Sequence, residues 1–153
     1  LNGPSPEVKG YGTLSEEVAG AAEWIQGLLK AGFAPRDIAI FGRTEAVIKD
    51  RAMPALARIG LTGHALSDET PPSTTDVSIG TMHRAKGLEF RIVLVMGCDK
   101  ALLPLAHAMK DIADEADREA FVEQERQLLY VACTRARERV MVSFTGKGSE
   151  YLG

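Results

Sequence analysis

Residues 92–96 (IVLVM) form the most continuously apolar run of the chain and constrain its fold more than any other feature. A second short apolar run covers residues 38–41 (IAIF), and further strand-like segments lie at 77–79 and 140–144. Strands that are apolar along their whole length are typical of parallel sheets, because helices bury both faces of such sheets. The sequence therefore predicts an α/β fold with a mainly parallel sheet and helices on both faces.

Helical patterns alternate with these strands. Thr13 and Glu16 have the spacing of a capping box, and they open an amphipathic helix that Gly32 ends. A second helical pattern covers residues 44–59. Pro54 lies inside this pattern and predicts a kink or two short helices, because proline lacks the backbone N–H.

The remaining elements are less regular. We expect a first strand within residues 8–11 and a short strand within residues 61–66, followed by an exposed loop at 67–75. A last helix is expected over residues 118–135. Its inward-facing residues would be Phe121, Val122, Leu128, Leu129, Ala132 and Cys133.

Composition limits the class of protein. A length of 153 residues suits one domain, and no segment is apolar for long enough to span a bilayer. Leu1 begins no signal-like segment, which predicts a cytoplasmic protein, and the absence of Met suggests a piece of a longer one. Cys98 and Cys133 are isolated and are expected to be reduced, buried thiols. The net charge of −3 argues against binding nucleic acid by bulk electrostatics.

Residues 81–90 (TMHRAKGLEF) are the first candidate site, because they form a charged, glycine-containing loop between two apolar strands. Loops on such a rigid frame often carry functional groups. The second candidate covers residues 124–137, where an apolar helix face ends in a cluster of arginines. Taken alone, that cluster is explained as compensation of the helix dipole by cations at a carboxyl terminus.

Other signals fail on their context. Residues 146–149 (GKGS) lack the upstream glycine and the following helix of a phosphate loop. The acidic pair at residues 114–115 lies in a polar helical stretch and is interpreted as a solvated helix face. His64, His83 and His107 have no metal-ligand spacing, so we predict no metal site in this chain.

The two candidate segments together resemble a known family. T-x-H-x-x-K-G-L-E-F at residues 81–90 resembles motif V of UvrD/Rep-type superfamily 1 DNA helicases. Residues 123–136 (ExERxLxYVAxTRA) resemble motif VI, and residues 38–44 (IAIFGRT) resemble the upstream motif IVa. The order and separation of these segments also fit the family.

The resemblance implies a RecA-like, three-layer fold. Helicases of this family contain two such lobes, which hold ATP between them and pass single-stranded DNA across them. This chain resembles the C-terminal lobe, with residues 1–12 as linker and first strand and residues 7–153 as one lobe. The phosphate loop and the magnesium-binding motif belong to the N-terminal lobe. The large insertion found in many relatives is replaced here by the connection at 61–75.

Residue roles on the nucleotide side follow from the same resemblance. Arg135 matches the arginine finger that reaches the γ-phosphate, and Glu89 matches the carboxylate that binds the ribose of ATP. Gly87 belongs to the ATP-binding loop and, with Lys86, resembles the hinge and inter-lobe contact. Two further residues are expected to orient the helix that carries Arg135, and these are Tyr130 and Thr134.

On the DNA side, Thr81 and His83 match positions that face the backbone of single-stranded DNA. Arg43 is expected on the same edge. Motif V would then contact nucleotide and DNA within one short segment.

Two functional hypotheses follow. The first is the second motor lobe of an ATP-dependent 3′→5′ DNA helicase or translocase, which uses ATP with Mg²⁺ held by the N-terminal lobe. Its partners would be single-stranded DNA and that lobe, and the chain alone is expected to be inactive. The alternative is a stand-alone or degenerate lobe that binds DNA or protein without ATPase activity. A phosphate loop in the reading frame upstream of Leu1 would favour the enzyme.

Overall fold

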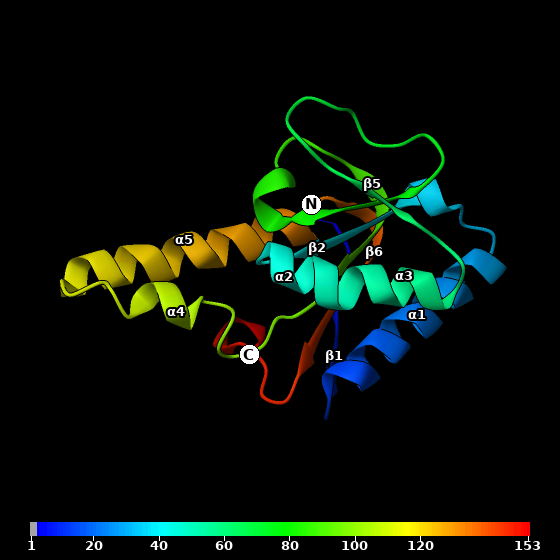
Figure 1. Ribbon diagram of the computed structural model, residues 1–153. Coiled ribbons are helices and arrows are strands. Elements are labelled where there is room, and N and C mark those ends of the chain that lie inside the picture. The colour runs from blue at the N-terminus through cyan, green and yellow to red at the C-terminus, as the bar shows by residue number, and fades with distance from the viewer. Residues whose placement is uncertain (1–2) are drawn as a thin grey trace.

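A six-stranded sheet lies between two layers of helices in the computed structural model, which describes residues 3–153 (Figure 1). The strand order is β1-β6-β5-β2-β4-β3, and every neighbouring pair is parallel. This arrangement confirms the predicted α/β architecture. The strands are β1 (Glu7–Tyr11), β2 (Ile38–Gly42), β3 (Gly63–Ala65), β4 (Val77–Thr81), β5 (Phe90–Val95) and β6 (Ala136–Thr145).

Two apolar clusters hold the layers together, one on each face of the sheet. The first cluster joins the sheet to α1, α2, η2 and α3, and the second joins it to η3 and α5. The helical elements are α1 (Leu14–Lys30), η1 (Pro35–Asp37), α2 (Glu45–Val47), η2 (Ile48–Ala52), α3 (Met53–Arg58), η3 (Met82–Arg84), α4 (Ala106–Met109), α5 (Glu115–Cys133) and η4 (Glu150–Leu152).

The beginning and end of α1 lie where the sequence predicted them, but only half of the predicted capping box forms. The Thr13 hydroxyl oxygen accepts a hydrogen bond from the Glu16 N–H at 3.1 Å and donates to the Glu16 carboxylate at 3.2 Å. The carboxylate therefore binds the capping side chain, whereas a capping box would use the backbone N–H. Gly32 follows the helix with φ at +107°, a conformation that glycine adopts without strain.

Pro54 interrupts the second helical stretch, as expected. The π-helical turn η2 lies directly before α3, and the Met53 N–H donates to the Ile48 carbonyl. Proline cannot donate a backbone hydrogen bond, so the stretch divides into α2, η2 and α3 rather than continuing as one helix.

Helix α5 differs from its prediction at the amino end. It begins at Glu115 rather than near residue 118, because the Asp114 carboxylate accepts from the Asp117 N–H at 3.1 Å. Its first half extends beyond the sheet (Figure 1), so Phe121 and Val122 are only half-buried. Strand β6 is also longer than predicted, because it begins almost immediately after α5 ends.

Both cysteines are free thiols in the described residues. Burial raises the pKa of the Cys98 thiol well above its usual value and that of Cys133 to about 12. The thiols are therefore protonated, as a structural role requires. No helix in the described part of the chain is long and apolar enough to cross a membrane.

Candidate active site

Motif V connects two opposite edges of the sheet. Thr81 pairs with Gly42 at the carboxyl end of β2, whereas β5 begins beside the amino end of β2. The short segment 82–89 therefore runs back along the sheet, and its Met82 and Ala85 are buried in the apolar cluster beneath α5. Consequently the two ends of motif V lie on opposite sides of the sheet. Thr81 lies where the carboxyl ends of the strands meet, which we call the carboxyl edge, and Glu89 lies where their amino ends meet, which we call the amino edge.

The amino edge brings two of the predicted nucleotide-facing residues together, Glu89 and Arg135, whereas Gly87 does not line the same cavity. The Phe90 N–H donates to the Arg135 carbonyl at 2.9 Å, which joins the end of motif V to the end of α5. A cavity of about 420 Å³ opens at this junction. Its lining includes Glu89, Tyr130, Thr134, Arg135 and Arg137.

Arg135 is held in place by three hydrogen bonds. Its Nε donates to the Val131 carbonyl at 3.0 Å, Nη2 to the Thr134 hydroxyl at 3.2 Å and Nη1 to the Leu88 carbonyl at 3.4 Å. A guanidinium has five N–H donors, so two remain for a ligand in the cavity. Because Leu88 belongs to motif V, this contact links the guanidinium to that loop.

Glu89 forms a loose ion pair across the same cavity. Its carboxylate lies 3.6 Å from Nη1 of Arg137, and the two side chains are 67% and 54% exposed. Exposed pairs of this kind contribute at most about 1 kcal/mol to stability, since water competes for both charges. Both side chains can therefore exchange this contact for a bound ligand at little cost.

The carboxyl edge has a more buried centre. Arg43 follows β2, and its Nε donates to both carboxylate oxygens of Glu125 on α5, at 2.8 and 3.0 Å. The side chains of Arg43 and Glu125 are 13% and 2% exposed. Glu125 also accepts from the Leu105 N–H at 2.9 Å. The contact uses Nε alone, so both Nη groups of Arg43 lie outside it.

His83 is exposed beside this ion pair. Partial desolvation lowers the pKa of its imidazole, the positive charges of Arg43 and Arg84 lower it further, and the charge of Glu125 opposes them. His83 is therefore neutral at pH 7. A neutral imidazole contributes one N–H donor and one acceptor at this edge, rather than a positive charge.

Lys86 and Gly87 lie between the two edges, in an exposed turn. Gly87 has φ at +82°, which explains the glycine at this position. Lys86 lines a cavity of about 350 Å³ between motif V and the loop after β3. The same loop contacts motif V through an ion pair of 2.8 Å between Asp68 and Arg84.

Two side-chain contacts at the candidate site were missed in the sequence. Glu125 lies within the motif VI segment, but its pairing with Arg43 was not predicted. Glu125 is spaced four residues from Leu129 and seven from Ala132, so all three lie on the same buried face of α5. This spacing could have predicted a buried carboxylate. Arg137 was attributed to the helix end, whereas it lies on β6 and faces Glu89.

A buried ionic network was also missed. Glu17 is fully buried, and its carboxylate accepts from Arg51, Thr145, Ser143 and the Gly97 N–H at 2.6–2.9 Å. Arg51 also donates to Asp99 at 2.8 and 3.1 Å. No sequence pattern links these residues, because the network joins α1, η2 and the carboxyl ends of β5 and β6.

The lining of the amino-edge cavity includes hydrogen-bond donors and one carboxylate acceptor. Two guanidinium groups suit phosphate oxygens, and one carboxylate suits a ribose hydroxyl. Within residues 3–153, no group of three or more histidine, cysteine, aspartate or glutamate side chains is arranged to hold a metal ion.

Comparison with known proteins identifies the class. The family model of the UvrD-like helicase C-terminal domain matches residues 53–147, and the chain belongs to this family. The matched region contains motifs V and VI, so the resemblance seen in the sequence is confirmed.

Individual relatives agree with this assignment. The chain is 46% identical over 67 residues to the ATP-dependent DNA helicase PcrA of Staphylococcus epidermidis, and 45% identical to PcrA of Staphylococcus aureus strain MRSA252. The matched segment covers 44% of this chain but 8% of the length of each relative.

Solved structures show the same fold. The C-terminal domain of a possible DNA helicase from Lactobacillus plantarum WCFS1 aligns over 99% of this chain and 80% of its own, with a TM-score of 0.67 and 22% identity. The arterivirus helicase nonstructural protein 10 aligns over 92% of this chain and 28% of its own, with a TM-score of 0.51 and 10% identity. The predicted RecA-like lobe is thereby confirmed as the fold.

Proposed function

We propose that this chain is the second motor lobe of an ATP-dependent 3′→5′ DNA helicase or translocase. One observation carries the proposal: motif V joins a cavity lined by Glu89 and Arg135 to an opposite edge that carries Thr81, His83 and Arg43. A lobe built in this way is suited to coupling a nucleotide to a DNA strand.

At the amino edge, Arg135 acts as the arginine finger. Its two free N–H groups would donate to phosphate oxygens of ATP bound to the other lobe, while Thr134 and Val131 keep the guanidinium oriented. A guanidinium placed in this way stabilises the charge that develops during phosphoryl transfer, an effect of about 10³–10⁵ in rate. Glu89 would accept from a ribose hydroxyl after releasing Arg137.

At the carboxyl edge, Thr81 and His83 bind the backbone of single-stranded DNA. The neutral His83 donates one hydrogen bond to a phosphate, and the Nη groups of Arg43 supply a positive charge while Nε remains on Glu125. Few and weak contacts suit a lobe that must bind and release the strand repeatedly. The net charge of −3 is compatible with this mode of binding.

Coupling between the edges follows two routes. Motif V is the first, since it holds Arg135 through Leu88 and ends at Thr81 on the other edge. Helix α5 is the second, since it carries Glu125 near its middle and ends beside Arg135. Closure of the two lobes on ATP would therefore shift both the loop and the helix that contact the DNA edge.

The test requires a polypeptide that contains this chain together with a lobe bearing a phosphate loop. Arg135→Ala should lower DNA-stimulated ATP hydrolysis about 10³-fold or more while the affinity for a fluorescent ATP analogue changes little. Arg135→Lys should not restore turnover, because an ammonium lacks the forked geometry. Arg58→Ala, at an exposed arginine of α3 on the other face of the sheet, is the matched control.

A second measurement tests the DNA edge separately. His83→Ala and Thr81→Val should weaken binding of single-stranded DNA, while ATP hydrolysis at saturating DNA stays near normal. Near-normal ATP turnover by Arg135→Ala would remove Arg135 from the finger role. DNA binding without any ATPase activity, in a polypeptide that contains both lobes, would favour the binding-module alternative.

A further inference from the structure

Strand β1 forms one lateral side of the sheet, and its outer side is unpaired. This free edge of β1 is distinct from the amino and carboxyl edges described above. Within residues 3–153, β1 is the outermost strand of the sheet and pairs only with β6. The Tyr11 carbonyl accepts from the Gly146 N–H at 2.8 Å, so the backbone groups of Tyr11 face β6. Backbone groups alternate sides along a strand in a parallel ladder, so those of Val8 and Gly10 face outward. These groups can hydrogen-bond to another extended chain.

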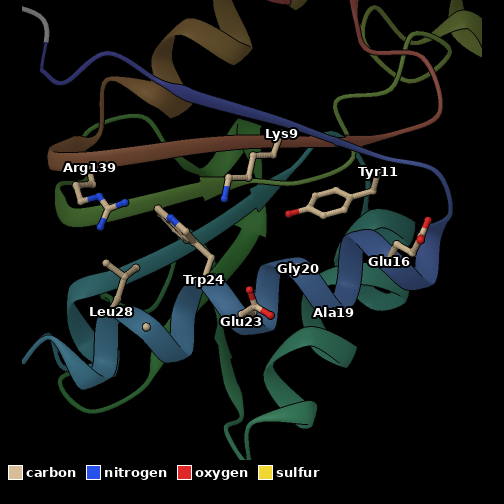
Figure 2. Close-up of a pocket in the computed structure, with 10 residues that line it drawn as sticks. Lys9, Tyr11, Glu16, Ala19, Gly20, Glu23, Trp24, Leu28 and Arg139 are labelled. Atoms are coloured by element: carbon tan, nitrogen blue, oxygen red, sulfur yellow. The ribbon is translucent and has the colours of Figure 1, made fainter.

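A groove runs along this edge on the α1 face of the sheet. It has a volume of about 750 Å³ and lies between β1 and α1 (Figure 2). Lys9 and Tyr11 extend into it from β1, and Glu23 and Trp24 extend into it from α1 (Figure 2). Gly27 of α1 also lines the groove and leaves open space beside it, because an added Cβ would meet no atom within 4 Å.

A second groove runs along the same edge on the α5 face. It has a volume of about 430 Å³, and its lining is mostly apolar. Val8 belongs to this groove and is 48% exposed, although valine is usually buried. Its walls include Leu129, Tyr130, Val142 and Leu152.

The groove on the α1 face has charged residues of both signs in its lining, with Glu16 and Glu23 on α1 and Lys9 and Arg139 on the strands. Arg139 is already engaged, with Glu7 at 2.7 Å and with the Trp24 ring at 5.4 Å. Lys9 forms no ion pair with any residue of the described part of the chain. An acidic side chain on a neighbouring strand would be its natural cross-strand partner.

We propose that the free edge of β1 binds an extended peptide segment of another protein by β-strand addition. Successive side chains of an added strand point to opposite faces, and the two grooves receive them in alternation. The peptide therefore alternates apolar residues, which enter the groove beside Val8, with polar residues, of which one is acidic and lies beside Lys9.

A second copy of this chain is a poorer occupant. Two β1 strands paired antiparallel about Lys9 would place like charges directly opposite, which is destabilising. Pairing about Val8 would place Lys9 opposite Glu7, but the Glu7 carboxylate already binds Arg139 at 2.7 Å. The proposal does not depend on ATP or on the motor function.

The test uses the 153-residue chain and a short fluorescent peptide, capped at both ends, that alternates valine with glutamate. Val8→Pro removes an outward N–H without removing a hydrogen bond to β6, and it should weaken binding about tenfold. Val8→Thr keeps the N–H and strand propensity, so it is the matched control. Circular dichroism and thermal unfolding establish that each variant folds.

Peptide variants test the geometry independently of any protein variant. Methylation of one alternate set of peptide amides should abolish binding, whereas methylation of the other set should leave it unchanged. Lys9→Glu should reverse the preference in favour of a peptide with lysine at the glutamate positions. In ¹⁵N spectra, the amides of Val8 and Gly10 should shift more than that of Lys9.

Three results of the peptide experiments would overturn the proposal. They are the absence of peptide binding, equal binding by Val8→Pro and Val8→Thr, and equal binding of the two methylated peptides. Sedimentation that shows a dimer of this chain, lost in Val8→Pro, would assign the edge to a second copy and also reject it.

Discussion

The carboxyl and amino edges of the sheet differ in how deeply their ion pairs are buried. At the carboxyl edge, Glu17 and Glu125 are buried and bind arginines at 2.6–2.8 Å. At the amino edge, the carboxylates of Glu7 and Glu89 remain about half exposed in their ion pairs with arginines. One edge has fixed charges and the other has exchangeable ones.

This difference separates charges that burial fixes in one ion pair from charges that can exchange their partners. A buried ion pair forms only if hydrogen bonds replace the water lost by both groups, so neither partner can leave without a large cost. An exposed pair exchanges with water and ligands freely. The side chains proposed to face the nucleotide therefore lie at the edge with exchangeable charges, and the residues proposed to face DNA, Thr81 and His83, lie at the edge with fixed ones.

The largest expected effect is at Glu17. Glu17→Ala should lower the free energy of unfolding by about 4 kcal/mol, because Arg51 loses one of its two carboxylates in a buried site. Glu17→Gln keeps the shape and should cost about 2 kcal/mol. Urea denaturation measures both variants. A cost below about 1 kcal/mol for Glu17→Ala would contradict a structural role for this network.

Glu125 should come next. Glu125→Gln should cost about 3 kcal/mol, since Arg43 is largely buried and would lose its carboxylate. Glu123→Gln is the matched control, because Glu123 lies one half-turn earlier on α5 in an exposed pair of 3.7 Å with Arg126. Equal costs for the two variants would show that burial of Glu125 does not matter.

Glu89 should show a small effect on stability. Glu89→Gln and Arg137→Gln should each change the free energy of unfolding by less than about 1 kcal/mol. High salt should reduce this effect further, because exposed charges are screened. A cost as large as that of Glu125→Gln would remove the contrast between the edges.

His83 should produce the smallest effect, visible as a pH dependence. Its folded-state pKa is lowered, so below the ordinary value of about 6.5 the unfolded chain binds more protons than the folded one. The contribution of His83 to stability is therefore complete above that pH and is lost as the pH falls toward the lowered pKa.

NMR titration of the imidazole measures this effect directly. Arg43→Gln removes a positive charge and should raise the pKa of His83, whereas Arg58→Gln, at a distant arginine, should not. An unchanged His83 titration in Arg43→Gln would separate the two residues electrostatically.

Sequence patterns were sufficient to predict a structural feature wherever that feature depends on local or periodic contacts. The capping residues around Thr13, the break at Pro54 and the apolar strands were predicted because each depends on neighbours a few residues away. Motif V and motif VI were recognised as ordered patterns of residue types. The start of α5 was misplaced because Asp114 was assigned to a solvated helix face, whereas it caps the helix.

The sequence by itself determined the class of fold and the family. Apolar residues identify the buried strands, and the order of the motifs identifies the family. Only the tertiary structure decided which charges pair. Glu125 meets Arg43, and Glu17 meets Arg51, because parallel strands bring distant chain segments to one edge. The same topology places Thr81 and Glu89 at opposite edges, since a connection between parallel strands must travel back along the sheet.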